Sequence, residues 1–183
     1  MLELFDGVLP SDGPSSVVSL ASGSSSDFFL HLHFLAKAVK QKQKVLLVTS
    51  RYTESNLRIM CSKLAIRWDP TLVRLIEVGE YLDDDLAATD QTKKLRETVE
   101  QLSAEYPVVL MDDGSLFDHL GASLADTAEW FGRMSDALPS PAGRLLLSFS
   151  HDCPIFRLLA RRADAVCRVE PVGAGYGKDV TGT

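Results

Sequence analysis

The segment between the first expected strand and the first expected helix has the length and composition of a phosphate-binding loop. A working loop follows the pattern Gly-x-x-x-x-Gly-Lys-Ser/Thr, in which backbone N–H groups surround the phosphates, the lysine neutralises their charge and the hydroxyl binds Mg²⁺. Only part of this pattern is present here. The corresponding residues form a degenerate version of the loop: Ser22, Gly23, Ser24, Ser25, Ser26, Asp27 and Phe28.

Asp27 and Phe28 stand where the lysine and the hydroxyl of a working loop would be. An aspartate repels a triphosphate instead of neutralising it. A phenylalanine offers no oxygen to a cation that prefers oxygen ligands. The sequence therefore predicts a nucleotide-binding architecture without the nucleotide, and we expect no cofactor.

A second candidate for phosphate chemistry is the strand at residues 108–113, which ends in Asp112 and Asp113. In nucleotide hydrolases of this architecture, such a strand ends in the aspartate that holds Mg²⁺ or its water shell. Because the partner hydroxyl is missing, we interpret the two acids as a relic of the fold in preference to a live metal site. The acidic run at residues 83–85 is interpreted as loop or helix-start charge. We expect no metal site.

The histidines and the strand serines do not form a readable catalytic set. His31 and His33 are two residues apart on an expected helix, so they face different directions and cannot share a metal. His151 follows a strand, but no serine or cysteine elbow accompanies it. The serines on expected strands lie at no readable spacing from a base: Ser19, Ser148 and Ser150. We therefore expect no catalytic residue and no enzyme.

The elements that must position these residues alternate along the chain. Apolar runs of strand length alternate with helix-length segments, which is typical of a parallel sheet covered by helices. Strands are expected at residues 16–20, 44–49, 72–78, 108–113, 145–150 and 165–169, and helices from 27 onwards, at 53–64, at 92–105, after 123 and at 155–162. The prediction is an α/β fold with three αβα layers around a mostly parallel sheet. We expect one domain over residues 1–183, cut short where another C-terminal strand would follow.

Composition limits the classes of function. The 183 residues carry a net charge of −6 and are 45% hydrophobic, which argues against nucleic-acid binding by one broad basic surface. No apolar run reaches the roughly 18 residues of a membrane span, and the N-terminus lacks the order of a signal peptide. The three cysteines are widely spaced, so neither a disulfide framework nor a zinc site is indicated. We expect a soluble, intracellular protein without a membrane partner.

Three segments together resemble the family of the sixth subunit of the Elongator complex. They are the strand and degenerate loop described above, the central strand that runs from Tyr-Pro-Val at residues 106–108 to Asp112 and Asp113, and the closing Gly-Tyr-Gly-Lys-Asp-Val-Thr-Gly at residues 175–182. The closing segment is the sharpest part of the match. The family ends its final core strand with a Gly–aromatic or Gly–small pair, then a basic residue, Asp-Val and usually a glycine shortly after. The resemblance covers most of the chain in the order of its elements.

This resemblance implies a RecA-like fold that lacks functional nucleotide-binding motifs. It implies a heterohexameric ring with two related RecA-like subunits, the fourth and the fifth, with two copies of each of the three. The ring of that family associates with the catalytic Elongator subcomplex and binds tRNA during modification of wobble uridines. Candidate tRNA contacts here are Arg161, Arg162 and Lys178, with ordinary surface charge as the alternative interpretation. Family members continue into further strands after the Lys-Asp-Val segment.

Two other functions stay open at this stage. The chain could be another catalytically dead RecA-like partner, such as a recombinase paralogue or a RecA-like inhibitor of division. It could also be an ATPase with unusual phosphate contacts. The leading hypothesis is a non-catalytic structural subunit that supports tRNA processing, located in the cytoplasm, with the nucleus as an alternative.

Overall fold

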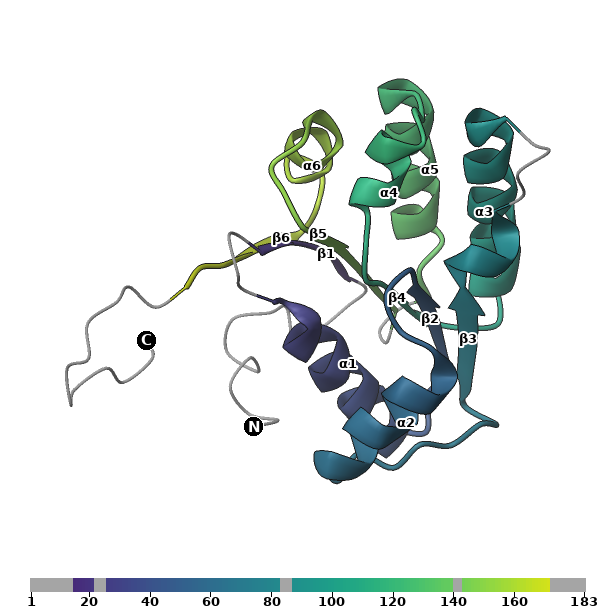
Figure 1. Ribbon diagram of the computed structural model, residues 1–183, viewed down its shortest axis with the longest axis vertical. Coiled ribbons are helices and arrows are strands. Elements are labelled where there is room, and N and C mark those ends of the chain that lie inside the picture. The colour runs from purple at the N-terminus through teal and green to yellow at the C-terminus, as the bar shows by residue number, and fades with distance from the viewer. Residues whose placement is uncertain (1–14, 22–25, 83–86, 140–142, 172–183) are drawn as a thin grey trace.

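A six-stranded sheet forms the middle layer of the protein (Figure 1). The computed structural model describes residues 15–21, 26–82, 87–139 and 143–171. The strands lie in the order β3-β2-β4-β5-β1-β6, and each pair of neighbours is parallel. Their bounds are β1 Ser15–Ala21, β2 Val45–Thr49, β3 Val73–Glu77, β4 Val108–Met111, β5 Arg144–Phe149 and β6 Ala165–Val169. Each strand expected from the sequence is present.

Helices cover both faces of this sheet. On one face lie α1 (Phe28–Lys40) and α2 (Glu54–Lys63). On the other lie α3 (Ala88–Ser103), α4 (Ser115–His119), α5 (Leu124–Asp136) and α6 (Pro154–Leu159). A short 3₁₀ helix, η1 (Val78–Tyr81), follows β3. The predicted α/β class, with three αβα layers and a parallel sheet, is therefore confirmed.

The burial of the strands follows their place in the sheet. Every residue of β1, β2 and β4 is buried, as are the last five of β5, because helices cover both faces. This explains why these strands read as near-continuous apolar runs in the sequence. The edge strands β3 and β6 are only partly buried. None of the described helices combines the length and the apolarity needed to cross a bilayer.

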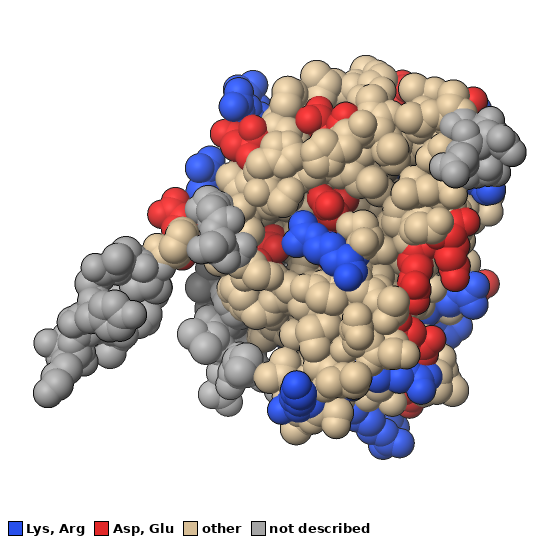
Figure 2. All heavy atoms as spheres, in the orientation of Figure 1, with Lys and Arg blue, Asp and Glu red and all other residues tan. Residues whose placement is uncertain are grey.

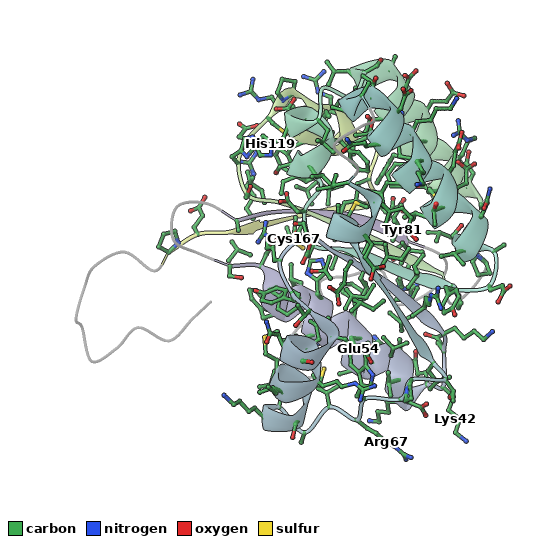
Figure 3. The ribbon with its side chains drawn as sticks, turned by 45° about the vertical axis from the view of Figure 1, so that its right-hand side comes forward. Lys42, Glu54, Arg67, Tyr81, His119 and Cys167 are labelled. Atoms are coloured by element: carbon green, nitrogen blue, oxygen red, sulfur yellow. The ribbon has the colours of Figure 1, made fainter. Side chains whose placement is uncertain are left out.

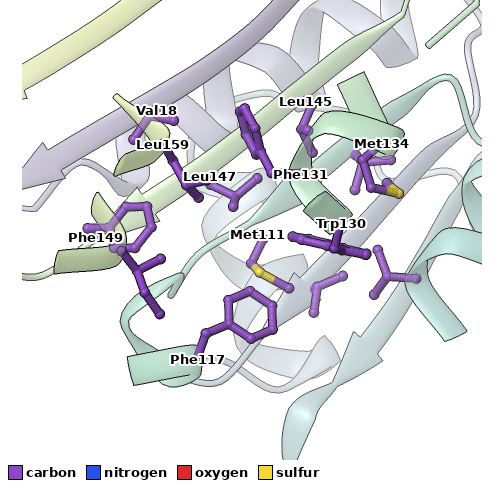
Figure 4. Close-up of a cluster of buried hydrophobic side chains, with 14 of the residues drawn as sticks. Val18, Met111, Phe117, Trp130, Phe131, Met134, Leu145, Leu147, Phe149 and Leu159 are labelled. Carbon is purple, nitrogen blue, oxygen red and sulfur yellow. The ribbon is translucent and has the colours of Figure 1, made fainter. Parts of the chain in front are cut away.

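Two separate cores fill the space between the layers. The larger core lies between the sheet and α3–α6, and Figure 4 shows part of it. There, Trp130, Phe131 and Met134 of α5 are buried with Leu145 and Leu147 of β5. The second core joins α1 and α2 to the opposite face of the sheet. Both cores come from apolar residues at helical spacing on one side of a helix, which is the pattern used to predict these helices.

The structure differs from the prediction around Gly114. No helix was predicted between the strand at residues 108–113 and the helix after residue 123, but the five-residue helix α4 begins directly after Gly114. The N–H of Ser115 donates to Asp113 Oδ1 at 3.0 Å, which starts the helix. A Cβ atom on residue 114 would lie 2.5 Å from the ring of Phe149, so only glycine fits between β4 and β5 at this point. The helix was missed because five residues are too few to show a period.

Two helix boundaries also differ from the prediction. Helix α3 starts at Ala88, before the expected Thr92, because its first turn is exposed and carries no apolar pattern. Helix α6 ends at Leu159 instead of Arg162. The residues that follow form a turn in which the N–H groups of Arg162 and Ala163 both donate to the Leu159 carbonyl.

Candidate functional site

The candidate site lies at the carboxyl edge of the sheet. Because the strands are parallel, their carboxyl ends meet at this edge, and ligands of such sheets bind there. Strand β1 leads into the degenerate loop, β4 ends before Asp112, and β5 lies between these two strands. Of the loop residues, Ser22, Gly23, Ser24 and Ser25 lie outside the described residues, whereas Ser26, Asp27 and Phe28 are described.

The carboxylate of Asp27 points into the protein. The residue is 1% exposed, and its Oδ2 accepts a hydrogen bond from Ser19 Oγ in β1 at 2.5 Å. Asp27 stands at the N-cap position of α1, yet its side chain makes no capping hydrogen bond to the helix. The acid that replaces the loop lysine is thus bound to the strand behind the loop and does not face the space where phosphates would bind.

Phe28, at the position of the magnesium-binding hydroxyl, belongs to an aromatic cluster. Its ring is buried, stacks on His31 with centroids 5.5 Å apart and lies 4.3 Å from the ring of Tyr52. An apolar contact between α1 and the segment before α2 therefore occupies this position. The first turn of α1 carries no hydroxyl, and the Oγ of Ser26, just before the helix, accepts a hydrogen bond from the N–H of Phe28 at 3.3 Å.

A buried polar network continues inward from Asp27. Ser19 Oγ lies 2.7 Å from Ser148 Oγ in β5, and Ser148 Oγ lies 3.3 Å from His31 Nε2. The same nitrogen is 3.1 Å from the carbonyl oxygen of Met111 in β4. The network links α1 to three neighbouring strands. Its serines and its histidine are at most 1% exposed, so a substrate cannot reach them without local opening.

Burial lowers the pKa of His31 below its ordinary value of 6.5. The hydrogen bond to Met111 and the charges of Asp27 and Asp112 act in the opposite direction, but the loss of solvent dominates. A neutral His31 can donate its Nε2 hydrogen to the Met111 carbonyl. Its Nδ1 has no hydrogen-bond partner among the described residues.

Stability is expected to fall as the pH drops below about 6.5, because of His31. Since the native pKa is lowered, the unfolded chain binds a proton in this range that the native state does not bind, so unfolding becomes more favourable. The variant His31→Gln cannot titrate and should lose this part of the slope. The measurement is urea unfolding of both proteins between pH 5 and 8.

Asp112 also contributes to the pH dependence of stability. Burial raises the pKa of Asp112, so its contribution has the opposite sign: the native state binds a proton more readily than the unfolded chain above pH 3.8. His31 and Asp112 act on each other's pKa, so the difference in slope between the two proteins includes any change at Asp112. Equal pH slopes for the two proteins would show that His31 is not held neutral in the native state.

Asp112 and Asp113 lie at the end of β4 and have different partners. Asp112 is 1% exposed and accepts hydrogen bonds from Thr49 Oγ1 and from the N–H of Ser50, at 3.0 Å for the latter. Asp113 caps α4 and lies 3.9 Å from Nη2 of Arg51. Asp112 therefore ties the end of β4 to the end of β2, and the positive charge of Arg51 lies beside the pair.

The basic residues proposed from the sequence as tRNA contacts do not lie at this edge. Arg161 and Arg162 are exposed in the turn between α6 and β6, which is at the amino edge of the sheet. Nη1 of Arg162 donates to the carbonyl of Ala128 at 3.0 Å, so this side chain also anchors α5. Lys178 lies outside the described residues. On the face in Figure 2, basic and acidic side chains are intermixed.

Sequence reasoning missed two groupings. The first is the polar network, although serines at buried positions of β1 and β5 were a usable signal, since buried hydroxyls need partners. The second joins Asp118, His151 and Cys153, whose potential ligand atoms all lie within 4.8 Å of one another. No spacing in the sequence relates Asp118 to the other two.

Comparison with known proteins supports the fold and nothing finer. No protein-family model matches the chain, and a search of curated proteins finds no match. Among solved structures, the chain is similar to the crystal structure of the flagellar accessory protein FlaH from Methanocaldococcus jannaschii, with a TM-score of 0.69 and 14% sequence identity. The match covers 86% of this chain and 71% of that chain. The expected RecA-like fold is thereby confirmed.

Proposed function

We propose that this chain is a non-catalytic RecA-like subunit of the Elongator type. In this proposal it forms a heterohexameric ring with two related RecA-like subunits, the fourth and the fifth, and has no ATPase activity of its own. The ring joins the catalytic Elongator subcomplex and binds tRNA during the modification of wobble uridines. The fold agrees with this proposal, and the resemblance of the loop, the central strand and the closing segment suggested it.

The observation that carries the proposal is the orientation of Asp27. A buried carboxylate bound to Ser19 stands in the place of the phosphate-binding lysine, and the buried ring of Phe28 follows it. A triphosphate placed here would meet negative charge and no cation from the loop position. The start of α1 therefore stabilises the contact between this helix and the sheet. This agrees with a fold whose function lies in the surfaces that bind other subunits.

A groove on the opposite side of α1 supports a role in assembly. It lies between α1, α2 and the segment before β3, and its lining includes Phe29 and Leu64, which are 41% and 43% exposed. Several basic residues also line it, among them Lys42 and Arg67, which Figure 3 shows near the lower end of the molecule. A partly apolar groove with a basic rim offers a contact for a neighbouring subunit with an acidic edge.

The net charge of −6 is compatible with tRNA binding only through a composite surface. The contacts that basic residues of different subunits make with phosphates add to the affinity for tRNA. Because the ring holds these subunits together, a tRNA bound to one subunit meets the basic residues of the next at a high effective concentration. In a ring, an acidic subunit can contribute a few arginines while its neighbours supply most of the positive charge. We therefore expect the isolated chain to bind tRNA weakly and the ring to bind it well.

Native mass spectrometry tests this proposal. The purified chain is mixed with the fourth and fifth Elongator subunits of its own organism, and the expected product is one complex with two copies of each chain. Leu64→Glu should lower the hexamer fraction, whereas Leu124→Glu, at an equally exposed leucine on α5, should leave it unchanged. Failure of the wild-type chain to enter a complex, together with binding to a recombinase or to single-stranded DNA, would favour the alternative of another inactive RecA-like partner.

A further inference from the structure

Helix α4 and the connection after β5 bring three possible metal ligands together. Asp118 lies on α4, His151 follows β5, and Cys153 is the N-cap residue of α6. One ligand atom from each residue lies within 4.8 Å of the other two. Helices α4 and α6 lie on the face of the sheet that is covered by α3–α6 (Figure 1).

The chemistry of this set selects the metal. A thiolate, an imidazole and a carboxylate are the ligand types that Zn²⁺ accepts, whereas Mg²⁺ and Ca²⁺ prefer oxygen ligands alone. Tetrahedral zinc with bonds of about 2.0–2.3 Å places its ligand atoms roughly 3.3–3.8 Å apart. The observed separations need to shorten by only about 1 Å to reach this range, which small rotations of Asp118 and His151 can provide because neither side chain is fully buried.

The surroundings already hold two of the ligands in place. His151 Nδ1 lies 3.3 Å from Ser150 Oγ, which in turn lies 3.2 Å from Ser115 Oγ. Such an outer hydrogen bond can orient an imidazole that binds a metal through its other nitrogen. Cys153 is buried, and its Sγ accepts a hydrogen bond from the N–H of Phe156 at 3.5 Å. The sulfur position is thus fixed by the start of α6.

The neighbouring charges suit a cation. Asp118 brings a carboxylate beside the thiol of Cys153, so a cation held between them would meet a negative charge. Binding of zinc to the sulfur would release the thiol proton. His119 stacks on His151 with ring centroids 5.3 Å apart, and Figure 3 shows His119 at the solvent side of this region.

We propose that Asp118, His151 and Cys153 bind one zinc ion, with water in the fourth position. The ion links α4 to the connection between β5 and α6, so it stabilises the larger half of the fold. This inference revises the sequence-based expectation that no metal site exists. It does not depend on the ring assembly, because all three ligands come from this chain.

Cobalt titration of the metal-free full chain tests the site. Co²⁺ in a tetrahedral site with a thiolate ligand gives a sulfur-to-cobalt charge-transfer band and intense visible bands, and added Zn²⁺ should bleach both at one equivalent. The charge-transfer band should be lost in Cys153→Ser and kept in Cys167→Ser, whose half-buried cysteine lies in β6. The absence of the band in the wild type, or its equal loss in both variants, would overturn the proposal.

A second variant distinguishes the loss of zinc binding from the loss of folding. His151 is exposed, so His151→Ala should fold normally, yet its zinc affinity should fall by roughly 10-fold or more. The affinity is measured by competition with a chromogenic chelator. Zinc should also raise the melting temperature of the wild type and leave that of His151→Ala almost unchanged. Equal affinities and equal thermal shifts in the two proteins would also contradict the site.

Discussion

Replacing Asp27 with lysine is expected to lower the free energy of unfolding by about 3–5 kcal/mol. The substitution puts the phosphate-loop residue back at its position in the sequence, but the position is 1% exposed and faces Ser19. A lysine there buries a cation without a partner, removes the acceptor of the Ser19 hydroxyl and places positive charge at the start of α1, where the helix dipole disfavours it. Urea unfolding of both proteins gives the difference.

The matched control for this variant is Ser26→Lys. Ser26 is the preceding residue and is exposed, so the same lysine there should change the free energy of unfolding by no more than about 0.5 kcal/mol. Asp27→Asn keeps an oxygen acceptor for Ser19 and should fall between the two lysine variants. If Asp27→Lys were as stable as Ser26→Lys, the carboxylate would not be bound inside the protein and the proposed role of the loop would be wrong.

The second large effect is expected at Phe131. Replacing this buried side chain of α5 by alanine removes a ring from the larger core and leaves a cavity beneath the sheet (Figure 4), which costs about 3–5 kcal/mol. The measurement is again the free energy of unfolding in urea, with m-values compared to check that both proteins unfold in the same way.

Leu124→Ala is the control on the same helix. Leu124 is 44% exposed at the start of α5, so its truncation should cost less than about 1 kcal/mol. If Phe131→Ala and Leu124→Ala lowered the free energy of unfolding by similar amounts, the apolar face of α5 that contains Phe131 would not be the face that packs on the sheet.

The central strands could be predicted because they are buried on both faces. Residues 45–49 and 108–111 are apolar nearly throughout, and no side of these strands meets solvent, so the sequence contains no competing signal. The helices on the two faces could be predicted from apolar residues at three- and four-residue spacing. The first turn of α3 could not, because its exposed side chains follow no such spacing.

Only part of the candidate site could be predicted from the sequence. Asp27 could be recognised because the phosphate-loop motif requires a lysine at its position. Its partners could not be recognised, because Ser19 and Ser148 are 129 residues apart and meet only where β1 and β5 pair. The proposed zinc ligands have the same difficulty, since α4 itself was not predicted.

Binding of ATP to the purified wild-type chain is the most direct test of the proposal that Asp27 and Phe28, at the positions of the loop lysine and hydroxyl, have become part of the interior. The measurement is equilibrium dialysis with labelled ATP and excess Mg²⁺. We expect no saturable binding, with retention of ATP no greater than by an unrelated protein. Binding of one ATP per chain that requires Mg²⁺ and is lost in Asp112→Ala would show instead that the chain has an active nucleotide site.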